Sequence, residues 1–218
     1  MKKVINILAG IASIALLVAA WQKWLPLELL ETFGFVTGAW TVWLTVKQNI
    51  WSWPIGIVSS GVFLFVFFQA RLFADSGLQI VYVVLGLLGW YWWLFGGKER
   101  SKLSVGNSSL KTNITLAVIA VVATYFFTNY LKSINDAAPF LDALTTVLSL
   151  IAQYLLTKKY IESWYIWISV DVIYIYLYAT KGLGLTSVLY FVFLSMCIKG
   201  IIDWRNSQKS ALPSNSNN

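Results

Sequence analysis

Eight long apolar runs dominate the sequence, and they constrain the fold more than any other feature. A helix needs about 20 mostly apolar residues to cross the hydrocarbon core of a bilayer. The runs cover about residues 4–20, 32–46, 53–70, 77–95, 113–131, 139–156, 163–180 and 184–202. Only 11% of the residues are charged, against roughly 25% in a soluble domain. The sequence therefore predicts an all-α polytopic membrane protein with about eight transmembrane helices.

Lysine and arginine are spread unevenly over the loops that these helices would leave on the two sides of a membrane. Twelve of the 16 lie on the side of the N-terminus, and the other four lie opposite. Because basic loops stay in the cytoplasm, we expect both chain ends there and the protein in a bacterial inner membrane. The net charge of +7 then reflects topology, and no nucleic acid partner is expected. A cleaved signal peptide over 4–20 remains an alternative, because this run follows two lysines and ends in small residues.

Several residue types and motifs that enzymes depend on are missing. There is no histidine, which excludes histidine-based catalysis and the usual mixed His/Cys metal sites. The single cysteine, Cys197, lies in an apolar run and is interpreted as a small buried hydrophobic residue. No glycine loop of the kind that binds ATP phosphates is present. We therefore expect neither an enzyme nor a bound metal or cofactor.

The sequence contains an internal repeat in which matched residues lie 111 positions apart, as Trp53 and Trp164 do. Matched positions are Lys47 and Lys158, Ser52-Trp53 and Ser163-Trp164, Phe63, Phe65 and Phe67 with Tyr174, Tyr176 and Tyr178, Leu72 and Leu183, Leu78 and Leu189, Tyr82 and Phe193, Gly89 and Gly200, and Trp93 and Trp204. An even number of helices separates the copies, so both face the same way. Parallel repeats place a substrate site between them near the membrane midplane, which favours a transporter with two rocking halves.

The expected organisation is one N-terminal helix followed by a 3+1+3 core. The segments are an N-terminal transmembrane helix over 1–24, a first three-helix unit over 32–96, a connector helix over 113–131, a second three-helix unit over 139–205 and a disordered tail over 206–218. The tail is rich in serine and asparagine, and such segments bury too little apolar surface to fold.

The strongest candidate site residue is Asp171, which lies in the middle of the run 163–180. Trp164, Trp167, Asp171 and Tyr174 follow one another at spacings of three and four, so they share one face of a helix. Aromatic rings attract a flat cation through its charge, and the carboxylate supplies the opposite charge. A helix contact, with Asp171 hydrogen-bonded or protonated, is the alternative.

Further polar and aromatic residues lie within or beside the other predicted helices. Thr146, Ser149 and Gln153 share one helix face, where they would either bind ribose-type hydroxyls or let helices pack closely. The first repeat contributes Asn49, Trp51, Trp53, Gln79 and Tyr82 as comparable candidates. The cluster Trp90-Tyr91-Trp92-Trp93 and the residue Trp204 are interpreted as anchors at the membrane interface.

These segments resemble the Pnu-type vitamin transporter family over about residues 33–205. In the first half the similar segments are Asn49-Ile-Trp-Ser-Trp53-Pro54-Ile-Gly56, Phe68 to Asp75, Gln79-Ile-Val-Tyr82 and Gly89 to Trp93. In the second half they are Asp142 to Ser149, Ala152-Gln153, the pair Trp164-x-x-Trp167 and Lys181-Gly182-Leu183. The Trp-x-x-Trp pair is the most specific of them.

The resemblance implies a fold similar to the SWEET sugar transporters, a homotrimer, and facilitated diffusion of an unphosphorylated B vitamin. A cytoplasmic kinase would then trap the vitamin, in pyridine nucleotide biosynthesis when the cargo is nicotinamide riboside. The family pattern assigns ring binding to Trp164 and Trp167, and polar contacts to Gln79, Thr146 and Gln153. Asp171 departs from the asparagine expected in nicotinamide riboside carriers.

The functional hypothesis is a uniporter for a cationic aromatic vitamin, nicotinamide riboside first. Thiamine, also a flat cation, and riboflavin are the alternative cargoes within the family. Coupling to protons through Asp171 is an alternative mechanism. A membrane receptor that transports nothing and a membrane enzyme are alternatives from other classes, although Asp171 has no titratable neighbours of the kind that an enzyme needs.

Overall fold

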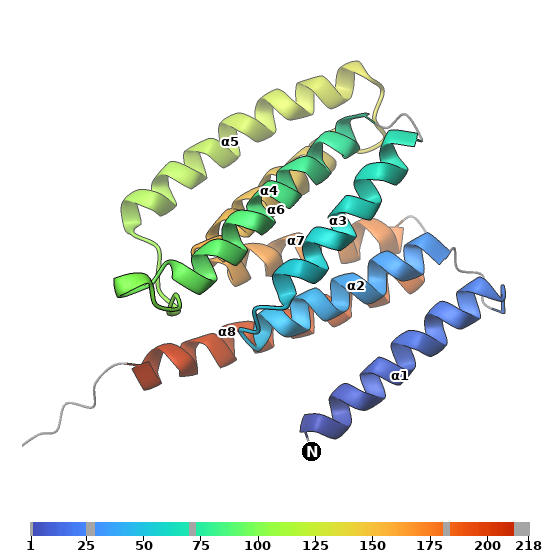
Figure 1. Cartoon of the computed structure of the whole chain (residues 1–218). Helices are drawn as coiled ribbons and strands as arrows, with labels where there is room; N and C mark the ends of the chain where they lie inside the picture. The colour runs from blue at the N-terminus through green and yellow to red at the C-terminus, as the bar shows by residue number, and fades with distance from the viewer. Residues whose placement is uncertain (1, 25–28, 70–72, 181–183, 212–218) are drawn as a thin grey trace, which may run out of the picture.

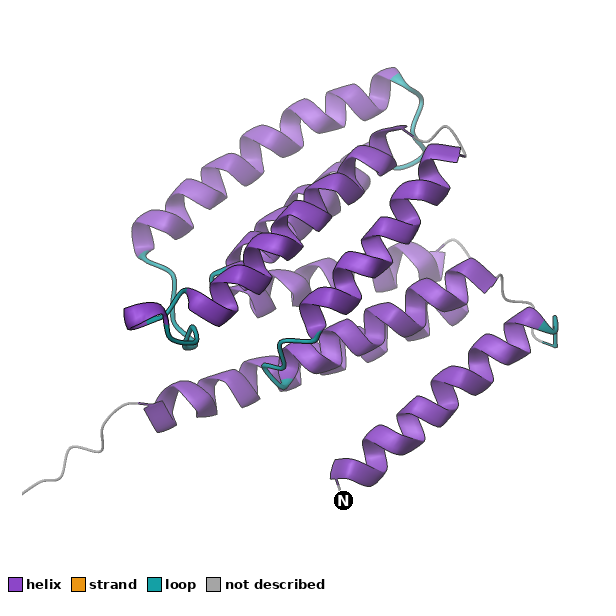
Figure 2. Ribbon diagram, viewed as in Figure 1, coloured by secondary structure: helices purple, strands orange, loops and turns teal. Residues whose placement is uncertain are grey.

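The computed structural model describes residues 2–24, 29–69, 73–180 and 184–211, and these residues form an all-helical bundle (Figures 1 and 2). The helices are α1 (Lys2–Trp21), α2 (Leu29–Val46), α3 (Ser52–Gln69), α4 (Phe73–Phe95), α5 (Leu110–Ser133), α6 (Pro139–Thr157), α7 (Glu162–Thr180) and α8 (Gly184–Ala211). A short 3-10 turn, η1 (Lys98–Arg100), follows α4. The predicted all-α fold with eight helices is confirmed.

The helices begin where local chemistry favours a helix start. Asn49 accepts a hydrogen bond from the backbone N–H of Trp51 at 3.0 Å and shapes the turn before α3. Ser109 caps α5 by accepting from the N–H of Thr112 at 3.1 Å. Pro139 stands in the first turn of α6, where its missing N–H leaves no bond unmade.

Four of the described helices are long and apolar enough to cross a membrane by length and composition, namely Ser52–Gln69, Ser76–Phe95, Leu110–Ser133 and Pro139–Thr157. The apolar segments Ala9–Trp21 and Thr32–Val46 are shorter. α7 and α8 are not among these four segments; α7 carries Asp171, and α8 continues past Gly200 into a segment with Asp203, Arg205 and Lys209.

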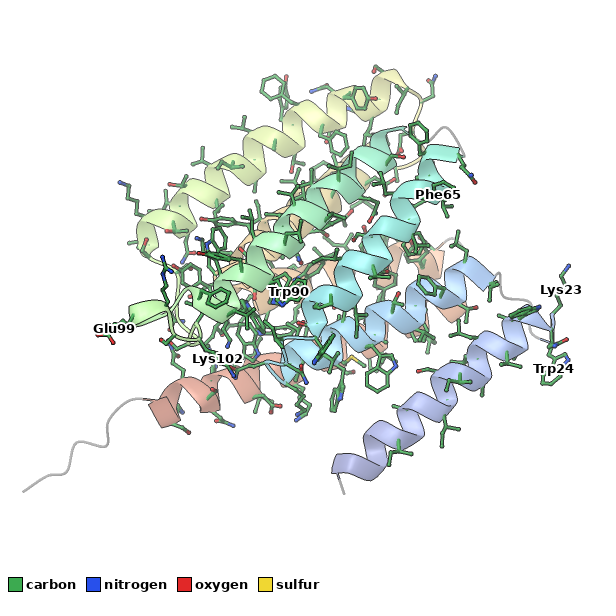
Figure 3. All side chains as sticks on the ribbon, in the orientation of Figure 1. Lys23, Trp24, Phe65, Trp90, Glu99 and Lys102 are labelled. Atoms are coloured by element: carbon green, nitrogen blue, oxygen red, sulfur yellow. The ribbon has the colours of Figure 1, made fainter. Side chains whose placement is uncertain are left out.

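Large apolar side chains cover much of the outer surface. Val121 on α5 is 72% exposed, and Phe65 on α3 is 61% exposed. Figure 3 shows Lys23 and Trp24 at the opposite end of the molecule from Glu99 and Lys102. Water would solvate such an apolar surface poorly, whereas lipid would solvate it well.

The two three-helix units are arranged as equivalent halves. In the first unit α3 packs against α2 and α4, and in the second α7 packs against α6 and α8. Between the units α2 packs against α8, and α4 packs against α6. The repeat relates α2 to α6 and α4 to α8, so it converts each of these interfaces into the other. α5 packs against α6 and α1 against α2, which confirms the predicted N-terminal helix and 3+1+3 core.

The two halves meet at four buried tryptophans, which we call the tryptophan layer. Its members are Trp53, Trp93, Trp164 and Trp204. The rings of Trp53 and Trp93 meet edge to face at 5.3 Å and 85°, and those of Trp164 and Trp204 at 5.3 Å and 86°. Trp93 and Trp204 join the two pairs at 5.7 Å. The two indole N–H groups of Trp93 and Trp204 donate to main-chain oxygens of the opposite half. These bonds are Trp93 to Leu156 and Trp204 to Thr45, each 3.1 Å.

The interpretation of Trp93 and Trp204 as interface anchors is wrong. Trp93 is 3% exposed and Trp204 is fully buried. Four consecutive aromatic residues point in directions about 100° apart around a helix, so they cannot all face lipid. Trp90 and Tyr91 are the exposed members of the cluster.

The predicted disordered tail begins too early, because α8 continues to Ala211. The last turns of α8 have partners in the segment that follows α4 and on α7. Gln208 donates to Asn107 at 2.6 Å, and Arg205 donates to the hydroxyl of Tyr165. Residues 212–218 of the predicted tail lie outside the described residues.

Candidate substrate-binding site

A cavity of about 400 Å³ lies between the two halves, within the size range of small-molecule sites. Residues of α2, α3, α4, α6, α7 and α8 line it. Nine of the residues expected from the sequence are among them, namely Trp53, Gln79, Tyr82, Ser149, Gln153, Trp164, Trp167, Asp171 and Tyr174. The fold thus brings together side chains that lie more than 100 positions apart in the sequence.

Three expected residues do not line the cavity. Trp51 is one of them, and it is 64% exposed. Asn49 is exposed and occupied with the turn before α3. On α6 the lining extends from Ser149 to Leu156, and Thr146 lies about one turn beyond that stretch. A shared helix face therefore predicts which side of the helix faces the cavity. It does not predict how far along the helix the cavity extends.

Asp171 is buried in α7, with 4% of its surface exposed, and it lines the cavity. The thiol of Cys197 on α8 donates a hydrogen bond to Oδ2 of Asp171 at 3.4 Å. Within the described part of the chain, no lysine or arginine forms an ion pair with this carboxyl group. Cys197 is buried as expected, and its contact with Asp171 is a feature that the sequence did not indicate.

The two residues of the Trp-x-x-Trp pair have different surroundings. Trp164 is 2% exposed, and its ring packs against Gly200 and Trp204. Trp167 lines the cavity and is only partly buried. Trp167 therefore has the more open ring face of the two.

A group of tyrosines lies farther along the cavity wall. Tyr174 on α7 and Tyr190 on α8 have ring centroids 4.7 Å apart, and Tyr178 stacks on Tyr190 at 5.4 Å. Tyr190 and Phe193 also line the cavity. Both were missed as site residues, although Phe193 occupies the repeat position of Tyr82.

A row of hydroxyl groups from the first half forms another wall that sequence reasoning missed. Its members are Thr41 and Thr45 on α2 and Ser52, Ser59 and Ser60 on α3. The repeat could have revealed part of it, because Ser60 is the counterpart of Asp171. The cavity therefore has an acidic aromatic wall on α7 and a neutral hydroxyl wall on α2 and α3.

Buried polar atoms without a partner are concentrated at the cavities. Within the described residues there are six such side-chain atoms, and four belong to residues that line this cavity, namely Thr41 Oγ1, Ser52 Oγ, Trp53 Nε1 and Trp164 Nε1. The other two belong to Thr124 and Thr128, which line a second cavity of about 380 Å³ formed by α5 and α6. Unpaired buried groups are rare in proteins, and each calls for an explanation.

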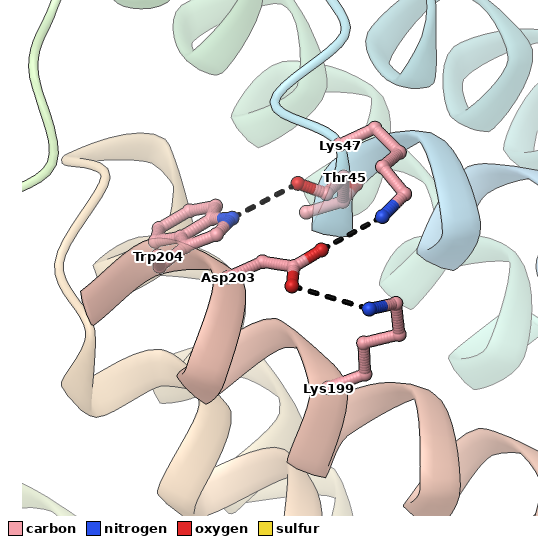
Figure 4. Close-up of polar contacts among 5 residues, drawn as sticks. All are labelled: Thr45, Lys47, Lys199, Asp203 and Trp204. Atoms are coloured by element: carbon pink, nitrogen blue, oxygen red, sulfur yellow. Dashed lines mark hydrogen bonds and ion pairs between the residues drawn. The ribbon is translucent and has the colours of Figure 1, made fainter. Parts of the chain in front are cut away.

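Charged residues join the halves beyond the tryptophan layer (Figure 4). Asp203 on α8 pairs with Lys47 at 2.7 Å and with Lys199 at 3.2 Å. Lys158, the repeat counterpart of Lys47, lies 3.2 Å from the ring centroid of Trp92, the counterpart of Asp203. In both contacts, a lysine that follows the first helix of one half meets the last helix of the other half.

Lys159 lies between α6 and α7 and is buried beside the same layer. Its ammonium group donates to the main-chain oxygen of Leu103 at 2.9 Å and lies 4.6 Å from the ring centroid of Trp93. Burial, followed by the charge of Lys102, lowers the pKa of Lys159 from 10.5 to about 8.

One protein family matches most of the chain. The model of the family described as nicotinamide mononucleotide transporter matches residues 28–206. This segment covers both three-helix units and the connector helix α5, and it leaves out α1.

Curated relatives are similar at low identity over most of their length. The nicotinamide riboside transporter PnuC of Escherichia coli strain K12 is 24% identical over 209 residues, covering 84% of this chain and 87% of that protein. PnuC of Neisseria mucosa is 29% identical over 191 residues, covering 82% and 73%. The riboflavin/roseoflavin transporter RibM of Streptomyces davaonensis is 26% identical over 178 residues, covering 80% and 83%.

The crystal structure of the vitamin B3 transporter PnuC has the same fold. The two structures superpose with a TM-score of 0.69 over 94% of this chain and 93% of that chain, at 24% identity. At this identity the likeness establishes the fold and leaves the ligand open. The predicted resemblance to the Pnu-type family is confirmed.

Proposed function

The chain belongs to the nicotinamide mononucleotide transporter family, and from this premise we propose that it carries nicotinamide riboside across the membrane by facilitated diffusion. It is an integral membrane protein with a cavity between two equivalent halves. Nicotinamide riboside is a flat pyridinium cation attached to a neutral sugar. These two chemical parts correspond to the two kinds of wall that the cavity offers.

Asp171 is the observation that carries this choice of cargo. An ionised carboxylate in a buried site is strongly disfavoured unless a positive charge accompanies it. No cation of the described residues accompanies Asp171, so a cationic ligand would supply the missing charge. Riboflavin, the cargo named for the relative RibM, has a neutral ring system and would leave the charge of Asp171 uncompensated.

The aromatic lining supports a planar ring in the same place. Trp167 lines the cavity one turn before Asp171, and Tyr174 follows nearly one turn after it. Offset stacking and cation–π attraction would hold the pyridinium between these side chains. Gln79 and Gln153 line the cavity from α4 and α6 and would bond to the carboxamide.

The symmetry of the halves suggests how the site would open. In this structure the tryptophan layer and the ion pairs of Asp203 hold the halves together at one end. Rocking of the two units would break these contacts and open the cavity at this end. The basic residues lie mainly at this end, which we assign to the cytoplasm of a bacterial cell, together with both chain ends.

Three further properties complete the proposal. The protein would assemble as a homotrimer in the inner membrane, as the family resemblance implies. A cytoplasmic kinase would phosphorylate the vitamin and prevent its return. Proton coupling through Asp171 is the alternative mechanism, because a buried carboxyl group can also carry a proton.

The direct test of ligand choice is thermal stabilisation of the purified protein. Nicotinamide riboside, thiamine, riboflavin and their phosphates would each be added at the same concentration. A ligand that binds the folded protein raises its melting temperature, and at equal concentration the tighter ligand raises it more. The proposal predicts the largest rise with nicotinamide riboside, whereas a larger rise with riboflavin, or no rise with any compound, would refute it.

A further inference from the structure

The four buried tryptophans differ in whether their indole N–H groups have partners. Trp93 and Trp204 donate to main-chain oxygens of the opposite half. Trp53 and Trp164, which are related by the repeat, have no acceptor for their N–H groups, and both line the cavity. A buried donor without an acceptor costs about 1–3 kcal/mol. An acceptor from a ligand in the cavity would remove that cost.

Two hydroxyl groups of the first half are unpaired in the same way. Thr41 on α2 and Ser52 on α3 line the cavity, and neither side-chain oxygen has a partner among the described residues. Thr45, one turn along α2, differs because its hydroxyl donates to the main-chain oxygen of Thr41 at 2.8 Å. The unpaired groups are therefore a property of these positions and not of threonine in this helix.

The second half has no equivalent set. Ala152 occupies the repeat position of Thr41 and cannot form hydrogen bonds through its side chain. Ser163, the counterpart of Ser52, donates to the main-chain oxygen of Tyr160 at 2.8 Å. The repeat thus supplies the scaffold, and only the first half carries free hydroxyls at these positions.

We infer that Thr41, Ser52 and the indole N–H of Trp53 bind the hydroxyl-bearing end of the substrate, opposite the acidic wall at Asp171. Sugar hydroxyls both donate and accept, so they can pair with the two protein hydroxyls and accept from the indole. This inference rests on the proposed function and deepens it. It assigns a neutral polyhydroxylated group, such as a ribose, to the α2–α3 wall, whereas the sequence hypothesis assigned that end to α6.

The test compares two ligands that share a charged ring and differ in the sugar. Nicotinamide riboside carries the ribose, and N1-methylnicotinamide has a methyl group in its place. Binding of each to the purified protein in detergent would be measured by calorimetry. The variants are Thr41→Val and the double variant Thr41→Val with Ser52→Ala. The matched control is Ser163→Ala, at the repeat position of Ser52, where the hydroxyl is paired with Tyr160 and is not among the groups that line the cavity.

Loss of one hydrogen bond to the sugar should weaken nicotinamide riboside binding by about threefold to tenfold in Thr41→Val. The double variant should lose more. Binding of N1-methylnicotinamide should stay within about twofold of the unsubstituted protein in every variant, because that ligand has no hydroxyl to lose. Ser163→Ala should bind both ligands within the same limit.

Two results would overturn the inference while leaving the proposed function intact. One is unchanged nicotinamide riboside affinity in the double variant. The other is an equal loss for both ligands, which would show that the hydroxyls only support the fold of the site. If the unsubstituted protein bound neither ligand, the proposed function and this inference would fail together.

Discussion

The indole N–H of Trp204 donates to the main-chain oxygen of Thr45 across the boundary between the two halves (Figure 4). The repeat reproduces this bond as Trp93 to Leu156, with the same length of 3.1 Å. Two equivalent bonds placed about a common axis would close one end of the cavity symmetrically. Rocking of the halves must break both.

Trp204→Phe should therefore destabilise the closed protein. Phenylalanine keeps most of the ring packing but removes one of the two hydrogen bonds to the oxygen of Thr45, which keeps the bond from the N–H of Gln48. The expected cost is about 0.5–1.5 kcal/mol. Thermal unfolding in detergent should show a lower melting temperature. Trp90→Phe, at an exposed position of α4, is the control and should unfold like the unsubstituted protein; an equal fall in both variants would contradict the account.

Gly200→Ala should also destabilise, for a steric reason. A Cβ atom at this position would lie 2.6 Å from the rigid ring of Trp164, and Gly89 meets Trp53 in the same way. Overpacking of this kind costs about 1–3 kcal/mol. Gly61→Ala on α3 is the matched control, because no atom lies within 4 Å of its added Cβ. The control should be neutral or slightly stabilising in the same unfolding measurement.

Asp171→Asn should separate cationic from neutral ligands. The change keeps the shape of the side chain and removes the negative charge. Affinity for nicotinamide riboside should fall by about tenfold, because the ring loses its opposite charge while asparagine, the residue expected in nicotinamide riboside carriers, keeps the polar contacts. Calorimetric titration with N1-methylnicotinamide should show a similar loss. Unchanged affinity for both cations would show that Asp171 does not balance the charge of the ring.

The burial of Lys159 should make the free energy of unfolding depend on pH in the alkaline range. Burial lowers its pKa in the folded protein to about 8, so the folded state holds this proton less tightly than the unfolded chain does. Below about pH 8 both states are protonated and the penalty of burying the charge is fully present. Between about pH 8 and 10.5 only the unfolded chain holds the proton, so the free energy of unfolding rises with pH.

The measurement for Lys159 is a difference between proteins. The melting temperature of the unsubstituted protein, relative to that of Lys159→Gln, should rise as the pH increases from 8 to 10.5. Lys111→Gln, at an exposed position of α5, should show no such trend against the unsubstituted protein. A parallel response of Lys159→Gln and the unsubstituted protein would contradict the prediction.

The sequence predicted the fold well because hydropathy and the repeat act over many residues at once. The pairing of Trp53 with Gly89 and of Trp164 with Gly200 follows the offset that the sequence revealed. The burial of Trp93 and Trp204 could not be predicted, because hydropathy does not distinguish a lipid-facing tryptophan from one at the centre of a bundle. Helical phase relative to a neighbouring helix decides this, and it depends on packing.

The site was predicted in part for a similar reason. Asp171 stood out because an acid in an apolar helix is costly wherever it points. Thr41 and Ser52 did not stand out, because such hydroxyls usually bond to their own helix, as Thr45 does. Only the structure separates a satisfied hydroxyl from an unpaired one. Cys197 and Tyr190 reach the site from α8 through tertiary packing that spacing along the chain does not reveal.

The central claim is tested most directly by uptake of radiolabelled nicotinamide riboside into liposomes that contain only the purified protein. The account predicts saturable uptake that stops at equal concentrations inside and outside and is unaffected by a proton gradient. At a ligand concentration below saturation, Asp171→Asn should take up nicotinamide riboside more slowly than the unsubstituted protein. Uptake no faster than in protein-free liposomes would contradict the account, and accumulation driven by a proton gradient would replace facilitated diffusion with proton coupling.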